Sequence, residues 1–180
     1  MKKSVIGLIA GISLGVIALF FDSKIVEFFY SNQYFFLSSI LKIFEPMIFV
    51  LFFMLLMAMI AFFTKKNWKI ILASPIIAGI FAHVIKLIIT RPRPLGLVEY
   101  LPIPLINIID FSFPSAHAAT MFALLPVLNK EYANLKWLWW TLVLVVTITR
   151  LYFNQHYLSD VIFGSVLGYF IGDFIASKNR

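Results

Sequence analysis

The stretch Lys69–Thr90, KIILASPIIAGIFAHVIKLIIT, decides the fold class of this chain. Its apolar residues continue far enough to cross a bilayer, which takes roughly 20 residues of α-helix. Its last turns nevertheless carry His83 and Lys86. Charge inside or beside a membrane span is energetically costly and usually marks function. The stretch therefore predicts a membrane helix that ends near a functional site.

The composition of the whole chain agrees with a membrane protein. Of its 180 residues, 62% are hydrophobic and 13% are charged, whereas soluble domains have about 25% charged residues. The length suits one compact bundle, so residues 1–180 are expected to form a single integral-membrane domain. The chain has no cysteine, which excludes disulfides and thiolate metal sites.

The net charge of +7 does not indicate a nucleic-acid partner. The basic residues are scattered at the ends of apolar segments and form no basic face of the kind that nucleic acid requires. A membrane protein with anionic lipid partners explains them better. No obligate protein partner is evident in the sequence.

Six apolar runs predict an all-α, polytopic membrane helix bundle with six transmembrane helices. The run at 115–129 is short for a span, and the run at 137–153 carries Arg150 near its end. Residues 24–44 mix aromatic residues with charges and are expected to form an interfacial helix between the first two spans. The runs are 4–21, 46–63, 69–90, 115–129, 137–153 and 157–176.

The distribution of Lys and Arg predicts the orientation in the membrane. If the N-terminus is inside, nine of the 15 basic residues lie on the inner side and six on the outer side. The positive-inside rule then places both termini in the cytoplasm and the motifs described below on the outer face. Four tryptophans at the inner boundary agree: Trp68, Trp137, Trp139 and Trp140. The first run lacks a small-x-small cleavage site, so a retained span is favoured over a secretory signal.

Two runs carry glycine at a spacing of four residues, which places each trio on one helix face and allows close packing in lipid. Whether the two faces pack against each other is left open by the sequence. The trios are Gly7, Gly11 and Gly15, and Gly164, Gly168 and Gly172.

His156 and Asp160 lie four residues apart, so they share a helix face. A carboxylate that accepts a hydrogen bond from one imidazole nitrogen leaves the other nitrogen free. That nitrogen can attack phosphorus and form a phosphohistidine. Taken alone, the pair fits a local His–Asp contact at a helix start better.

Ser115 and His117 follow Pro114 at the start of a predicted helix. Free backbone N–H groups at such a start attract anions, and His117 could protonate a leaving oxygen. The alternative is an ordinary helix start with an incidental histidine.

Three cations lie at helix ends on the same predicted face: Lys86, Arg93 and Arg150. They could neutralise a phosphate and its transition state, although lipid headgroups are the common partners of such residues. Arg91 fits headgroup anchoring better than the phosphate site. His83 is a candidate border of the site, although a buried, hydrogen-bonded histidine is the favoured interpretation.

The combined pattern K-x6-R-P, P-S-x-H and R-x5-H-x3-D, from Lys86 to Asp160, resembles the type 2 phosphatidic acid phosphatase (PAP2) superfamily. The layout is similar to that of its small bacterial members. Two positions depart from the family pattern, Ala116 where glycine is frequent and Thr149 where serine is frequent. Neither departure removes a reacting group.

The resemblance implies a metal-independent phosphatase that uses no cofactor and no metal. In it His156 would be the nucleophile, Asp160 would orient His156, and His117 would be the general acid and later activate water. The phosphate would be held by Lys86, Arg93, Ser115 and Arg150.

The implied enzyme is a lipid phosphatase of the bacterial inner (plasma) membrane, with its active site on the periplasmic or outer face. Candidate substrates are lipid A 1-phosphate, undecaprenyl pyrophosphate and phosphatidylglycerol phosphate, with a slight preference for a lipid A or isoprenyl substrate. One alternative is the vanadate-dependent haloperoxidase branch, whose members are soluble and much larger. A second is a non-catalytic lipid-phosphate binding or transport protein on the same scaffold, against which the intact His117, His156 and Asp160 argue.

Overall fold

The computed structural model describes residues 2–94 and 111–179, and these residues form helices and no strand. Most of the stretch between the predicted runs 69–90 and 115–129 therefore lies outside the described residues. The helices are α1 (Lys2–Leu19), α2 (Asp22–Ser31), α3 (Phe35–Leu41), α4 (Met47–Phe63), α5 (Trp68–Ile89), α7 (Ala116–Glu131), α8 (Lys136–Tyr152) and α9 (Leu158–Lys178), with a 3-10 turn, η2 (Ala133–Leu135), before α8.

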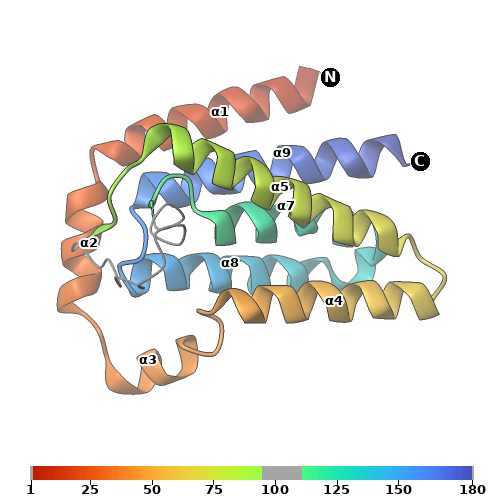
Figure 1. Cartoon of the computed structure of the whole chain (residues 1–180), viewed down its shortest axis with the longest axis horizontal. Coiled ribbons are helices and arrows are strands. Elements are labelled where there is room, and N and C mark those ends of the chain that lie inside the picture. The colour runs from red at the N-terminus through yellow and green to blue at the C-terminus, as the bar shows by residue number, and fades with distance from the viewer. Residues whose placement is uncertain (1, 95–110, 180) are drawn as a thin grey trace.

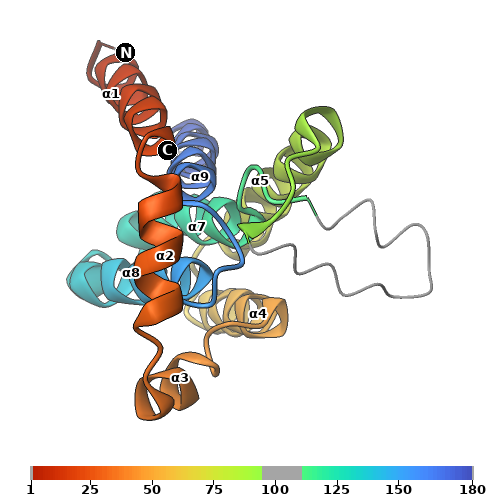
Figure 2. The same cartoon turned by 90° about the vertical axis from the view of Figure 1, so that its left-hand side faces the viewer.

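Helix α7 runs through the middle of the bundle, and α4, α5, α8 and α9 pack around it (Figures 1 and 2). The side of α7 that faces its neighbours is rich in alanine, and Ala118, Ala119 and Ala123 are fully buried. Small side chains let helices approach closely in lipid. Helix α7 begins at Ala116 with no positive φ, so alanine fits this position without backbone strain.

The glycines of α9 form its contact with α7. A Cβ added at Gly168 would lie 2.0 Å from the backbone oxygen of Ala119, and one at Gly164 would lie 2.5 Å from that of Ser115. Gly172 repeats the pattern one turn further along, with a backbone oxygen at 2.2 Å. The two backbones therefore approach so closely that only glycine fits at these positions.

The glycines of α1 lie against side chains of α9 rather than against its glycines. A Cβ added at Gly11 would meet the side chain of Val166 at 2.6 Å, and one at Gly15 would meet the ring of Phe163 at 2.7 Å. The two glycine trios thus pack on different partners, α1 on α9 and α9 on α7. Together they place α9 between α1 and the central helix.

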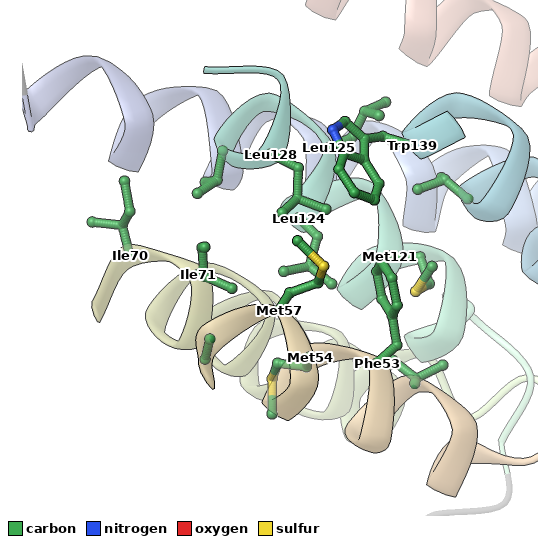
Figure 3. Packing of buried hydrophobic residues seen from close by; sticks show 14 of the residues in the cluster. Phe53, Met54, Met57, Ile70, Ile71, Met121, Leu124, Leu125, Leu128 and Trp139 are labelled. Atoms are coloured by element: carbon green, nitrogen blue, oxygen red, sulfur yellow. The ribbon is translucent and has the colours of Figure 1, made fainter. Parts of the chain in front are cut away.

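Large apolar side chains pack together in the interior of the bundle (Figure 3). They come from α4, α5, α7 and α8, and the buried ones among them stabilise the bundle through close packing. The labelled members are Phe53, Met54, Met57, Ile70, Ile71, Met121, Leu124, Leu125, Leu128 and Trp139.

Each of the six apolar runs forms a helix, but the helices differ in length. Among the described residues, three segments are long and apolar enough to cross a membrane alone: α5, η2 with α8, and α9. Helices α1 and α2 would count as a fourth if the pair, bent by 66°, is one span. Helices α4 and α7 have 17 and 16 residues. The structure thus confirms an all-helical fold with three or four candidate spans, and six spans stay a prediction.

Both termini lie at one end of the bundle, together with the α4–α5 and α7–α8 connections (Figure 1). The residues around Arg93, Ser115 and His156 lie at the other end. Trp137 is exposed at the terminal end, whereas Trp139 is buried in the core and donates a hydrogen bond to the carbonyl of Tyr132 at 3.1 Å. A tryptophan boundary at the inner membrane surface stays a prediction.

Two helices, and not one, form in the segment at 24–44. Helix α2 crosses the motif end of the bundle, and α3 follows after a break near Asn32 (Figure 2). Phe35 and Phe36 are highly exposed, as expected for side chains that contact lipid. An interfacial location of this segment stays a prediction.

Candidate active site

The three sequence motifs meet at the end of the bundle opposite the termini (Figure 1). Lys86 lies in the last turn of α5, and His156 lies in the turn before α9. The backbone carbonyl of Ser112, just before α7, lies 2.8 Å from Nδ1 of His156 and 3.4 Å from Nζ of Lys86. The Ser112 carbonyl therefore contacts both Lys86 of the first motif and His156 of the third. It lies shortly before Ser115 of the second motif.

A tight turn presents His156. Asn154 has a φ of 52°, in the left-handed region, which asparagine tolerates better than most residues. The backbone N–H groups of Gln155 and His156 both donate to the carbonyl of Arg150, at 3.0 and 3.1 Å. The chain thus folds back on the end of α8 and places the imidazole inside the site, where His156 is 3% exposed.

The orientation of His156 comes from the main chain. Nδ1 donates its proton to the Ser112 carbonyl, which leaves Nε2 unprotonated. Oδ2 of Asp160 lies 3.7 Å from Nδ1, beyond hydrogen-bond length, and accepts instead from the backbone N–H of Tyr157 at 2.9 Å. The predicted pair is therefore adjacent, but without the direct hydrogen bond that the sequence interpretation assumed.

His156 is neutral in this environment. Burial lowers the pKa of His156 well below its ordinary value of 6.5, and the positive charges of Lys86, Arg93 and Arg150 lower it further. Nη1 of Arg93 lies 3.5 Å from Nε2. An unprotonated nitrogen of His156 thus lies next to a cation of the kind that binds phosphate.

His117 occupies the first turn of α7, and its Nε2 is buried with no hydrogen-bond partner among the described residues. Buried polar atoms in proteins are nearly always satisfied. The imidazole nitrogen, unsatisfied among the described residues, therefore makes His117 a candidate for contact with a substrate.

Ser115 caps α7. Its Oγ accepts a long hydrogen bond from the N–H of Ala118 at 3.4 Å, and its own N–H donates to the carbonyl of Asp160 at 3.0 Å. The ordinary helix-start role is thus present in the structure. Ser115 also ties the start of α7 to the start of α9.

Arg150 is 3% exposed and is held by the segment before α4. Its Nη1 donates to the backbone carbonyl of Glu45, and its Nη2 lies 3.5 Å from the Glu45 carboxylate. Its Nε has no partner among the described residues. The sequence did not connect Glu45 with Arg150, because the two residues lie 105 positions apart.

Lys86 and Arg93 bind backbone carbonyls at the rim of the site. Nζ of Lys86 donates to the carbonyls of Phe111 and Ser112, and Nη1 of Arg93 donates to the carbonyl of Gln155 at 2.8 Å. These bonds hold both cations where the three sequence motifs meet. All four predicted phosphate ligands are therefore at one end of the fold.

Arg91 does not occupy the headgroup-facing position that the sequence favoured. Its guanidinium lies between two carboxylates, 2.7 Å from Oδ1 of Asp160 and 2.8 Å from Oδ2 of Asp22. Asp22 was not identified from the sequence as a site residue. The sequence does show Asp22 as a lone carboxylate between two apolar segments, and it shows two arginines in the Arg-Pro-Arg-Pro run. Neither feature identifies the residue that it binds.

His83 lies on α5 one turn before Lys86, and its Nδ1 is 2.7 Å from the carbonyl of Gly79. This agrees with the favoured interpretation of a hydrogen-bonded histidine. Its side chain also lines an apolar groove of about 460 Å³ between α4 and α5. A role of His83 at the border of the site stays a prediction.

Comparisons with known proteins agree with the motifs. A family model described as the PAP2 superfamily matches residues 67–178. No curated protein matches the sequence significantly. The fold is similar to the crystal structure of the first transmembrane PAP2 type phosphatidylglycerolphosphate phosphatase from Bacillus subtilis, with a TM-score of 0.79, 21% identity, and coverage of 99% of this chain and 96% of that chain. Since the family model spans more than half of the sequence, the chain belongs to the PAP2 superfamily.

Proposed function

We propose that the protein is a membrane lipid phosphatase that hydrolyses a phosphomonoester or pyrophosphate headgroup through a phosphohistidine at His156. The arrangement of His156 carries this proposal. The Ser112 carbonyl holds Nδ1 at 2.8 Å, and Nε2 lies 3.5 Å from Nη1 of Arg93. A neutral imidazole nitrogen beside a guanidinium is suited to attack a phosphorus atom whose oxygens that guanidinium binds.

The reaction proceeds in two steps. In the first, Nε2 of His156 bonds to phosphorus, the bond from phosphorus to the leaving oxygen breaks, and His117 donates a proton to that oxygen. In the second, a water molecule attacks phosphorus, the nitrogen–phosphorus bond breaks, and His117 accepts the proton of the water. Inorganic phosphate leaves in both cases; the lipid product is an alcohol when the substrate is a phosphomonoester and a phosphomonoester when the substrate is a pyrophosphate.

Positive charge stabilises both transition states. Lys86, Arg93 and Arg150 surround His156 closely enough to lower its pKa, so they also act on a phosphate bound to it. The first-turn N–H groups of α7, beside Ser115, attract anions. No metal or cofactor is proposed.

The apolar groove between α4 and α5 supports a lipid substrate. Its lining includes Leu87, next to Lys86 on α5, and Thr120, which donates to the backbone carbonyls of Ala116 and His117. One hydrocarbon chain in this groove would place its headgroup near the site. Lipid would then reach the enzyme laterally within the bilayer.

The substrate is proposed from the same three candidates: lipid A 1-phosphate, undecaprenyl pyrophosphate and phosphatidylglycerol phosphate. The protein of similar fold is a phosphatidylglycerolphosphate phosphatase, which adds support for the third. The groove holds a hydrocarbon chain of any of them. The headgroup contacts with Arg93 and Arg150 are common to all three.

We further propose that the enzyme lies in the bacterial inner (plasma) membrane with both termini in the cytoplasm. Nine of the 15 basic residues lie on the side assigned to the cytoplasm. The termini and the site lie at opposite ends of the bundle. The active site then faces the periplasm or the cell exterior.

Phosphate release by purified protein from a panel of the three lipids tests the function. The wild-type protein should hydrolyse at least one of them, and His156→Ala should insert and fold but release no phosphate. Near-normal release by folded His156→Ala would contradict the assignment of the nucleophile. Binding of all three lipids without release by the wild-type protein would favour the non-catalytic alternative.

A further inference from the structure

Asp22 lies at the bend between α1 and α2 and makes three hydrogen bonds to residues of the site region. Its side chain is 5% exposed. Oδ1 accepts from the backbone N–H of Ser159 at 2.9 Å, and Oδ2 accepts from Ser159 Oγ at 2.6 Å and from Arg91 Nη2 at 2.8 Å. The family model begins at residue 67, so this carboxylate comes from outside the matched region.

Arg91 connects Asp22 to Asp160, which lies beside the proposed nucleophile His156. Its Nη1 donates to Oδ1 of Asp160 and to Oγ of Ser159, both at 2.7 Å. Its guanidinium also lies over the ring of Tyr157, 3.9 Å from the centroid. Because Oδ1 of Asp160 is bound by Arg91, Oδ2 is the oxygen that lies 3.7 Å from His156.

We propose that Asp22 is a positioning residue for the phosphoryl-transfer site, which acts through Arg91 and Ser159 to hold the Asp160 carboxylate beside His156. This inference rests on the proposed function and extends it to a residue far from the three motifs. Asp22 itself does not touch the substrate.

The charges in this network explain why a second carboxylate is needed. Arg91 paired with Asp160 alone would neutralise the carboxylate that lies beside His156. Two carboxylates sharing one guanidinium leave one negative charge in the cluster. When Nε2 bonds to phosphorus, the imidazole becomes positive, and that remaining negative charge stabilises it.

Other contacts bind the same N-terminal segment, residues 22–45, to the region around His156. The hydroxyl of Tyr152, at the end of α8, accepts from the N–H of Tyr34 and lies 2.9 Å from Ser38 Oγ. Glu45 holds Arg150. The segment thus contacts both sides of the turn that carries His156. Asp22 is one of several residues through which the segment is bonded to this region.

The test compares Asp22→Asn with Glu27→Gln in the purified full-length protein. Asparagine keeps an acceptor for the Ser159 N–H but removes the charge that Arg91 binds. Glu27 lies on the same helix, α2. Its side chain has no hydrogen bond or ion pair among the described residues, and its change to glutamine removes the same charge. The substrate is whichever of the three panel lipids the wild-type protein hydrolyses fastest.

Asp22→Asn should lower kcat by about 10- to 100-fold with KM within about twofold, because small displacements at a reacting centre cost about this much. Glu27→Gln should match the wild-type protein. Folded Asp22→Asn with wild-type kcat, or an equal loss in Glu27→Gln, would overturn the inference. A change confined to KM would also overturn it, because positioning of the nucleophile acts on the chemical step.

Two further measurements keep the outcome decisive. The losses in Asp22→Asn and Arg91→Gln should not add in the double variant, because both act through Asp160; additive losses would overturn the shared route. If Asp22→Asn does not fold, Ser159→Ala replaces it, with a lower kcat expected and an unchanged kcat overturning the inference. A wild-type protein inactive on every panel lipid would instead overturn the proposed function.

Discussion

The backbone carbonyl of Ser112 lies 2.8 Å from Nδ1 of His156, closer than either carboxylate oxygen of Asp160. The imidazole is therefore oriented by the main chain that precedes α7, and the carboxylate contributes charge rather than a direct hydrogen bond. A backbone acceptor cannot be removed by substitution of a side chain. The orientation of His156 thus depends on how the segment before α7 is folded.

Acidification should destabilise the protein through His156. Burial and three nearby cations hold the pKa of His156 well below 6.5 in the folded protein, so the unfolded chain takes up this proton first as the pH falls. The stability is therefore fully present above about pH 6.5 and is lost progressively below it. The melting temperature in detergent should fall between about pH 7.5 and about pH 5, and His156→Gln should show a smaller fall. Equal falls in both proteins would contradict this.

Hydrolysis should not need a divalent metal. Magnesium sites are built from carboxylates together with phosphate oxygens. Among the described residues, the carboxylate next to His156 is that of Asp160, and Arg91 binds it. Phosphate release should persist in a chelator, and vanadate should inhibit it because vanadate mimics a five-coordinate phosphorus. Loss of activity in chelator that added Mg²⁺ restores would refute the expectation.

Gly168→Ala should destabilise the bundle, and Gly7→Ala should not. An added Cβ at Gly168 would lie 2.0 Å from a backbone oxygen of α7, whereas at Gly7 the nearest atom is a ring carbon of Phe170 at 3.8 Å. Overpacking of this kind typically costs about 1–3 kcal/mol. Thermal unfolding of the two variants beside the wild-type protein measures the difference. Equal melting temperatures for both would show that α7 and α9 are not packed this closely.

Cysteine labelling tests the topology in this cysteine-free chain. Ser31→Cys places an exposed thiol at the motif end of the bundle, and Asn67→Cys places a partly exposed thiol at the terminal end. In intact spheroplasts an impermeant thiol reagent should label the cysteine at 31, and the cysteine at 67 should be labelled only after lysis. The reverse pattern would overturn the orientation, and outer-leaflet lipids would no longer be the proposed substrates.

The sequence predicted those parts of the structure that depend on local spacing. Apolar runs located the six long helices, because a helix in lipid needs a continuous apolar surface. The spacing of His156 and Asp160 predicted that they are neighbours, and their distance of 3.7 Å agrees. The glycine trios predicted close helix packing, although their partners became known only from the structure.

The parts that the sequence did not predict depend on contacts between distant segments. Asp22 meets Arg91 from 69 positions away, and Glu45 meets Arg150 from 105 positions away. A single charged residue shows that a partner is needed but does not identify it. The Ser112 carbonyl is a backbone group, so no side-chain pattern marks it. The break between α2 and α3 was missed because aromatic residues continue across it.

The last helix, α9, seats its glycines on the backbone of α7 and begins with Ser159 and Asp160. During synthesis this helix leaves the ribosome after the helices that precede it. Until then the face of α7 that contacts α9 is uncovered, Ser115 lacks the carbonyl to which its N–H donates, and Arg91 lacks one of its two carboxylates. The candidate active site therefore assembles only after α9 has been made, and a chain truncated before α9 should lack it.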